Sequence, residues 1–182
     1  VPTAVIGFTL FRLIKEFLLQ QPWIVIWALL IGGVLLILFE QWYGKRQHVP
    51  QSLEQMSYRQ ALLIGFAQSL AVVPGVSRSA ATIVAGLAVG MERTAIVEFS
   101  FLLAVPTILA ATALDIFKTP ANVLHGNWNI LIIGALAAFV VAWLAIRFFL
   151  QFVRKHTFVP FGVYRIAIAL VFLVLLTTAL RF

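Results

Sequence analysis

The residues best suited to chemistry lie in one short polar segment, residues 74–82, which reads Pro-Gly-Val-Ser-Arg-Ser-Ala-Ala-Thr. Apolar runs flank this polar segment on both sides, at residues 61–73 and 80–89, and Arg78 lies between its two serines. An arginine at the centre of a membrane helix costs about 2.5–3.5 kcal/mol on insertion scales, and such residues usually have a functional partner. We therefore expect Arg78 to bind a ligand.

The backbone around Arg78 is predicted to form a break between two helices. Pro74 lacks an N–H and Gly75 tolerates left-handed backbone angles, so the incoming helix should end there. Ser77 or Ser79 can then cap a new helix, whose first N–H groups point into the break. Phosphate suits such a helix start, because the arginine binds it through a bidentate fork. The alternative is a kinked membrane helix whose arginine extends to the interface.

The composition indicates an all-α integral membrane protein with several spans. Of the 182 residues, 63% are hydrophobic and 10% are charged, against about 25% charged residues in soluble domains. The net charge of +7 falls mostly in short loops, which favours anionic lipid headgroups and cytoplasmic loops over nucleic acid. The absence of cysteine excludes thiolate chemistry and cysteine metal sites.

The apolar runs predict a bundle of membrane helices that forms one transmembrane domain, residues 1–182. Residues 1–11 look like the end of a helix whose beginning precedes Val1. A pair of glycines, Gly32 and Gly33, permits close helix contact. The predicted spans are residues 22–39, 94–117, 129–153 and 160–180, and loops are predicted at residues 40–59 and 118–129.

The two runs beside the polar segment are each shorter than the roughly 20 residues that cross a bilayer. They predict a re-entrant helical hairpin at about residues 60–91. If the basic loops at residues 45–46 and 154–155 both lie on the cytoplasmic side, an even number of crossings must separate them. Two spans between these loops already supply that number, so the hairpin should enter and leave on the same side, with the polar segment at its tip.

The polar residues outside this segment include one carboxylate with two interpretations and three histidines. Glu98 has two interpretations: a carboxylate favoured by the start of its helix, or an intramembrane group that faces the polar segment. None of the three histidines lies in a predicted span, and His48 has no second ligand at metal spacing. We therefore predict no metal ligands in this sequence.

The polar segment and its surroundings resemble a known family. Residues 58–61, Tyr-Arg-Gln-Ala, precede the segment, and residues 98–106, Glu-Phe-Ser-Phe-Leu-Leu-Ala-Val-Pro, follow it. Together they are similar to the C-terminal part of the undecaprenyl-diphosphate phosphatases, the bacitracin-resistance proteins of bacteria. The likeness extends over essentially the whole chain, and every named position of the family's Pro-Gly-x-Ser-Arg-Ser-x-x-Thr motif matches. Ala80 stands where many members have glycine, a difference that leaves the hydrogen-bond donors intact.

The resemblance implies a multi-pass hydrolase of the bacterial inner membrane. It would remove the terminal phosphate of undecaprenyl diphosphate, an isoprenyl diphosphate lipid, and so recycle the carrier for peptidoglycan synthesis. The family fold has two inverted repeats, each with a re-entrant hairpin, and this chain would supply the second repeat. By the resemblance the catalytic residues are Ser77, Arg78 and Thr82. The phosphate-binding residues are Pro74, Gly75, Ser77, Arg78, Ser79 and Thr82.

The family's other motif, a Glu-x-x-x-Glu helix followed by Ser-Ser-x-Gly-His, does not occur in this sequence. Gln68 occupies the equivalent place, but an amide cannot replace a carboxylate as a base or metal ligand. We therefore expect the chain to lack the first repeat and to hydrolyse diphosphate lipid negligibly alone. A divalent cation, Mg²⁺ or Ca²⁺, stays a candidate cofactor, with ligands expected in the part preceding Val1, and a homodimer stays a candidate assembly.

Two other functions compete with hydrolysis. A lipid-phosphate flippase or anion transporter is one, because inverted repeats with broken helices around a midplane anion site also occur in transporters. Carboxylates and a histidine in the missing repeat would indicate hydrolysis, whereas a second Ser/Arg segment without them would favour transport. A purely structural subunit is the other, and it must explain an arginine within an apolar region.

Overall fold

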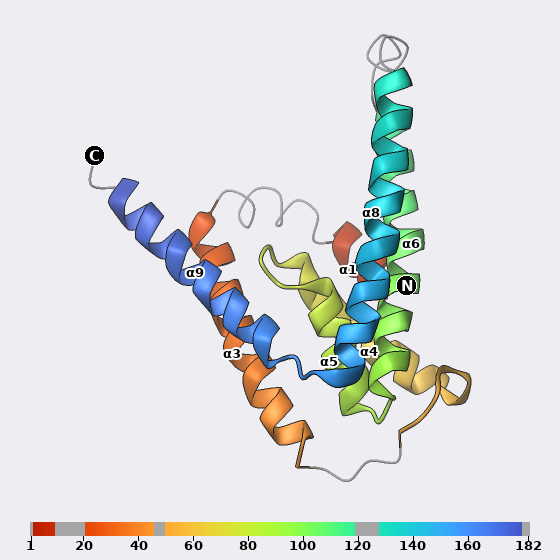
Figure 1. Cartoon of the computed structure of the whole chain (residues 1–182), viewed down its shortest axis with the longest axis vertical. Helices are drawn as coiled ribbons and strands as arrows, with labels where there is room; N and C mark the ends of the chain where they lie inside the picture. The colour runs from red at the N-terminus through yellow and green to blue at the C-terminus, as the bar shows by residue number, and fades with distance from the viewer. Residues whose placement is uncertain (1, 10–20, 46–49, 119–127, 180–182) are drawn as a thin grey trace. The chain divides into compact units, whose positions relative to one another are not determined.

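The computed structural model describes residues 2–9, 21–45, 50–118 and 128–179, and every regular element in these ranges is a helix (Figure 1). The all-α prediction is thereby confirmed. The α-helices are α1 (Pro2–Thr9), α3 (Pro22–Tyr43), α4 (Tyr58–Gln68), α5 (Arg78–Ala88), α6 (Arg93–Lys118), α8 (Trp128–Lys155) and α9 (Val159–Ala179). Two short 3-10 helices, η2 (Leu53–Gln55) and η3 (Ser69–Val72), accompany them.

Four helices among the described residues are long and apolar enough to cross a membrane, namely α3, α6, α8 and α9. They match the four predicted spans to within a few residues at each end, and the protein is a membrane protein. The predicted end of the first span, at residue 39, was wrong. We expected Glu40 to begin a polar loop, but α3 continues to Tyr43 and Glu40 is a buried residue on this helix.

The chain divides into two compact units, one of residues 1–97 with 157–182 and the other of residues 98–156. The division falls within α6, whose first turn belongs to the first unit. The single transmembrane domain over residues 1–182 therefore stays a prediction.

In the first unit, α3 and α9 lie side by side (Figure 1). Their contact is close because glycines meet there. A Cβ atom on Gly33 would lie 2.8 Å from the carbonyl oxygen of Gly162, and a Cβ on Gly162 would lie 2.8 Å from the oxygen of Gly33. The expectation of close helix contact at the glycine pair is confirmed.

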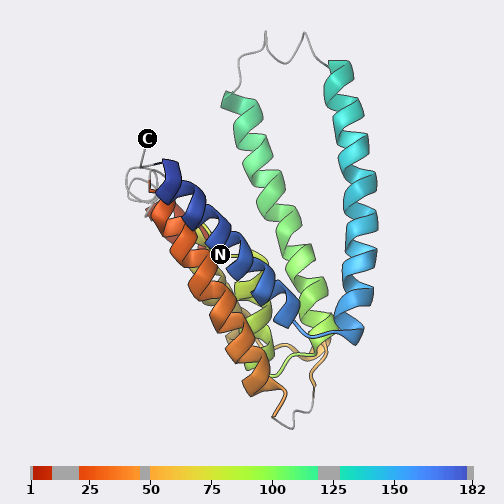
Figure 2. The ribbon, with the colours of Figure 1, turned by 60° about the vertical axis from the view of Figure 1, so that its left-hand side comes forward.

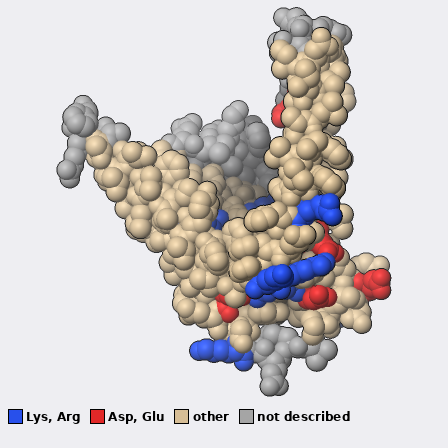
Figure 3. Space-filling model, in the orientation of Figure 1, with Lys and Arg blue, Asp and Glu red and all other residues tan. Residues whose placement is uncertain are grey.

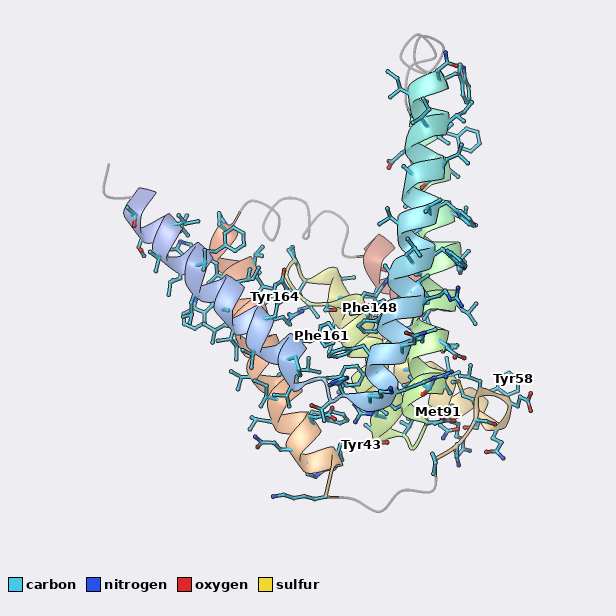
Figure 4. The ribbon with its side chains drawn as sticks, in the orientation of Figure 1. Tyr43, Tyr58, Met91, Phe148, Phe161 and Tyr164 are labelled. Atoms are coloured by element: carbon cyan, nitrogen blue, oxygen red, sulfur yellow. The ribbon has the colours of Figure 1, made fainter. Side chains whose placement is uncertain are left out.

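Also in the first unit, α4, η3 and α5 form a helical hairpin whose two ends meet. Gln51 N–H donates to Gly90 O at 3.1 Å and Glu92 N–H donates to Gln51 O at 2.9 Å. Met91 is fully buried at this base, whereas Tyr58 at the start of α4 is 93% exposed (Figure 4). The predicted hairpin is present as a fold element. Its re-entrant position in a bilayer and the inverted repeat stay predictions.

The second unit consists of α6 beyond Val97 and α8, which Figure 2 shows apart along most of their length. Phe101 and Phe149 make an edge-to-face ring contact, with centroids 5.7 Å apart. On the face shown in Figure 3, this unit carries little charge along its length, and Lys and Arg gather toward one end. Its apolar side chains are mostly exposed, Phe139 to 72%, as lipid-facing residues would be. The predicted loop at residues 118–129 lies mainly outside the described residues.

Candidate active site at the hairpin tip

The break between the two helices of the hairpin is tight and depends on glycine. Helix α4 ends at Gln68 and η3 carries the chain to Val72, after which Val76 N–H donates to Val73 O at 3.1 Å. Gly75 has φ of +89°, a conformation that glycine adopts without the strain of a side chain. The predicted break is present, but the prediction that Pro74 and Gly75 end the incoming helix was wrong in position, because α4 already ends at Gln68 and the 3-10 turn η3 follows it.

Ser77, rather than Ser79, caps the outgoing helix α5. The Oγ atom of Ser77 accepts from Ala80 N–H at 3.2 Å, and its carbonyl accepts from Ala81 N–H at 2.9 Å. The first N–H groups of an α-helix point out of its N-terminal end. Together with the helix dipole, they favour an anion at this point. Ser79 is exposed and Arg78 is partly buried, both on the first turn of α5.

Thr82 and Gln68 meet inside the hairpin, one from each helix. Thr82 is 1% exposed and Gln68 is 3% exposed. The hydroxyl of Thr82 donates to Arg78 O at 3.0 Å and lies 3.5 Å from Oε1 of Gln68. In this arrangement Thr82 supports the helical turn that carries Arg78. The structure thus brings together seven of the eight candidate site residues, which are Gln68, Pro74, Gly75, Ser77, Arg78, Ser79 and Thr82.

The eighth candidate, Glu98, is the first residue of the second unit and is partly buried on α6. It is no part of the unit that contains the hairpin. Both interpretations of this carboxylate, as a helix-start charge and as a group facing the polar segment, stay predictions.

Arg165 was missed by the sequence reasoning. It lies on α9 immediately after Tyr164, which Figure 4 labels. Its Nη2 donates to Gly75 O at 2.8 Å and to Ala28 O at 3.3 Å. The signal was present in the sequence, because an arginine inside the last apolar run has the same insertion cost that drew attention to Arg78.

The hairpin tip offers a poor set of ligands for a divalent cation. Its described oxygen donors are hydroxyls and the amide of Gln68, whereas Mg²⁺ and Ca²⁺ prefer carboxylates. In the part of the chain that the structure describes, no three His, Asp or Glu side chains are grouped to hold a metal ion. His48 and His125 lie outside that part, and His156 stacks on Phe152 at the end of α8, with centroids 4.4 Å apart. The residues present do not by themselves fit the cation that the resemblance implies.

Comparison with known proteins gives consistent matches along the chain. The model of the family described as bacitracin resistance protein BacA matches residues 1–171. The undecaprenyl-diphosphatase of Sulfurihydrogenibium sp. (strain YO3AOP1) is 44% identical over 172 residues, which cover 94% of this chain and 68% of the relative. That of Persephonella marina is 45% identical over 173 residues, or 95% of the chain and 67% of the relative.

A third relative, the undecaprenyl-diphosphatase of Campylobacter jejuni subsp. jejuni serotype O:6, is 47% identical over 174 residues, which are 94% of the chain and 64% of the relative. The chain therefore spans about two thirds of the length of these curated relatives.

Proposed function

Because the chain belongs to the bacitracin resistance protein BacA family, we propose that it acts in the dephosphorylation of undecaprenyl diphosphate to undecaprenyl phosphate. The observation that carries this proposal is the geometry of the hairpin tip. A glycine turn at Gly75 leads directly into a helix capped by Ser77 and begun by Arg78. Such a helix start, with a guanidinium beside it, is chemically matched to a terminal phosphate.

The proposed contribution of these residues is electrostatic. Arg78 grips the diphosphate through two parallel hydrogen bonds, and the first N–H groups of α5 stabilise the charge that develops on the phosphoryl oxygens. In the reaction, water attacks the terminal phosphorus and the bond to the bridging oxygen breaks. Inorganic phosphate leaves, and the lipid keeps one phosphate.

Hydrolysis also needs a base for the water and a proton donor for the leaving oxygen. Around the hairpin tip the described side chains offer hydroxyls and the amide of Gln68, and an amide is not a base. The Glu-x-x-x-Glu and Ser-Ser-x-Gly-His motifs are absent from this sequence. We therefore propose that the base and proton donor, together with ligands for a Mg²⁺ or Ca²⁺ cofactor, come from residues outside it.

The proposal extends to location and partners. The exposed apolar helices suit a bilayer, and a bacterial inner membrane is where a peptidoglycan lipid carrier would be recycled. A homodimer also belongs to the proposal, as does the absence of nucleic acid among the partners. The flippase or transporter alternative is not favoured, since the matched relatives are named as diphosphatases.

The test is phosphate release from farnesyl diphosphate and undecaprenyl diphosphate. The chain is purified alone and also after co-expression with the part of the Sulfurihydrogenibium relative that the match leaves uncovered. We expect release from the pair and negligible release from the chain alone. Arg78→Lys and Arg78→Ala should each lower turnover of the pair by about 100- to 1,000-fold, the range seen on removing one transition-state donor.

The matched control is Arg154→Lys, which changes an exposed arginine at the end of α8 and should leave turnover unchanged. Near-normal turnover by Arg78→Lys would overturn the bidentate assignment. If no form releases phosphate while the lipid moves between leaflets of a vesicle, transport replaces hydrolysis.

A further inference from the structure

We propose that Arg165 is a positioning residue for the phosphate-binding turn. Its guanidinium holds the carbonyl of Gly75 against α3 and thereby fixes where Ser77 and Arg78 lie. This inference deepens the proposed function and rests on it for its catalytic consequence. The contact itself is a property of the fold.

One nitrogen of Arg165 connects three parts of the first unit. Its Nη2 donates from α9 to Gly75 O at the hairpin tip, at 2.8 Å, and to Ala28 O on α3, at 3.3 Å. Gly75 precedes the cap Ser77 by two residues and Arg78 by three. A displacement of the Gly75 carbonyl therefore displaces the start of α5.

Glycines make room for the guanidinium. A Cβ atom on Gly32 would lie 2.7 Å from Nη2 of Arg165. At the tip, a Cβ on Gly75 would lie 2.8 Å from Val25 O and 3.0 Å from the Cβ of Ala28. The arginine thus passes over one glycine of α3 to reach another at the tip, and neither site has space for a side chain.

The chemistry of the break explains why a charged donor is needed. Where a helix is interrupted in an apolar region, its carbonyls lack intrahelical partners, and each unsatisfied group costs several kcal/mol in lipid. Hydrogen bonds from a charged donor are about twice as strong as neutral ones. Arg165 therefore satisfies the carbonyl that the turn at Gly75 exposes.

Arg165 is not itself fully satisfied, which argues against a role in stability alone. Its Nε is buried and has no hydrogen-bond partner among the described residues. A buried donor without a partner is destabilising, because it loses its hydrogen bonds to water and gains none in the protein. Arg165 is thus buried with one unsatisfied N–H group while it bonds to the turn before Ser77. This combination favours a role in positioning the site.

Arg78 and Arg165 should differ in whether lysine can replace them. Arg78 needs its planar fork, so lysine fails there. At Arg165 a single nitrogen makes both hydrogen bonds, so the ammonium of lysine can substitute in part. Loss of the charge in Arg165→Met should release the tip, with a fall in kcat/KM of about ten- to a hundredfold, as expected for a displacement of roughly 1 Å near the reacting groups.

The experiment combines two readouts on Arg165→Met and Arg165→Lys, in nanodiscs and in the co-expressed pair. Hydrogen–deuterium exchange of residues 73–81 reports whether the tip stays docked. Exchange of residues 51 and 89–92 reports whether the hydrogen bonds at the hairpin base stay formed. Steady-state kcat and KM for farnesyl diphosphate report the site. The control Arg147→Met changes an exposed arginine on α8 and should alter neither readout.

We expect Arg165→Met to speed exchange at the tip alone and to lower kcat/KM, and Arg165→Lys to restore kcat/KM to within several-fold. Unchanged exchange at the tip in Arg165→Met, or faster exchange with unchanged kcat/KM, overturns the proposal. If Arg165→Met does not insert, Gly32→Ala displaces the guanidinium from the other side and must give the same two effects. If no form releases phosphate, only the proposed function fails, and exchange at the tip still decides whether Arg165 fixes the turn.

Discussion

The two ends of the helical hairpin are held in different ways. At the base, the side chain of Gln60 donates to Gln51 Oε1 at 2.8 Å and to Val89 O at 3.0 Å, in addition to the backbone pair between residue 51 and residues 90–92. A bidentate ion pair adjoins it, in which Arg93 Nη2 lies 2.5 Å from Glu40 Oε1 and Nη1 lies 3.3 Å from Oε2. The base therefore has several hydrogen bonds of its own and an adjoining charge pair, in which the carboxylate of Glu40 is buried and Arg93 is partly buried.

At the tip, the bonds that the structure describes are of another kind: the serine cap, the Thr82 hydroxyl bond to a backbone carbonyl, and the two bonds from Arg165 to backbone carbonyls. The difference indicates a division of labour. We expect the base to contribute most of the stability of the hairpin, whereas the tip positions the start of α5 for the proposed ligand. Changes at the base should act on stability alone, and changes at the tip should act on the site as well as on stability.

The largest effect should come from the ion pair beside the base. Glu40 is 5% exposed, and Arg93 also lies over the ring of Phe158, 4.8 Å from its centroid. Glu40→Gln leaves Arg93, whose side chain is 23% exposed, without its counter-charge. We expect a loss near the lower end of the about 3–5 kcal/mol that breaking a fully buried pair costs. Unfolding in mixed detergent micelles measures this loss. Glu54→Gln, at an exposed carboxylate, is the control and should change stability by no more than about 0.5 kcal/mol; equal losses for the two variants would contradict the assignment.

Alanine variants of two glycines, one at the tip and one at the base, allow a closer comparison of packing at the two ends of the hairpin. Gly75 and Gly90 have φ of +89° and +92°, so alanine at either should cost about 1–2 kcal/mol for the left-handed conformation. Alanine at Gly75 would also meet Val25 O, whereas nothing lies within 4 Å of a Cβ on Gly90. Gly75→Ala should therefore cost about 1–3 kcal/mol more, a typical penalty for overpacking.

The same micelle unfolding assay compares the two variants, and exchange at residues 73–81 locates the damage. Indistinguishable losses for Gly75→Ala and Gly90→Ala would mean that the tip does not pack against α3.

The smallest effect on stability is expected from single cysteine substitutions at exposed positions before and after the hairpin. Labelling these cysteines tests whether the hairpin is re-entrant. Single cysteines at Lys45 and Glu92, both exposed, should react with an impermeant reagent from the same side of oriented cells. A cysteine at Phe117, 87% exposed near the other end of α6, should react from the opposite side. Labelling of Lys45 and Glu92 from opposite sides would rule out the hairpin topology.

The sequence predicted the elements of this fold well because the relevant signals are local. Apolar runs mark the four long helices, and the glycine turn and the serine cap follow from the preferences of Gly75 and Ser77 for particular backbone positions. The choice between Ser77 and Ser79 needed the structure, since both are good capping residues.

Long-range partners were beyond the sequence reasoning. Glu40 and Arg93 are 53 positions apart, and Glu40 follows an apolar span, so it was assigned to a polar loop instead of a buried pair. Arg165 lies 90 positions from Gly75, and no local pattern shows which helix faces the tip. Thr82 and Gln68 had been identified as candidates from the resemblance, but their mutual contact depends on how the hairpin packs.

The glycine crossing of α3 and α9 has a mechanical consequence. Gly33 and Gly162 face each other, and the side chains of Ile37 and Ile166 pack closely beside them. The two helices therefore form a tightly packed pair, which Arg165 connects to the turn. Nη2 of Arg165 on α9 donates both to Ala28 O on α3 and to Gly75 O at the tip. A change in the crossing angle between α3 and α9 should therefore move the Gly75 carbonyl. The alignment of the start of α5 therefore depends on two helices that contribute no residue to the proposed phosphate-binding turn itself.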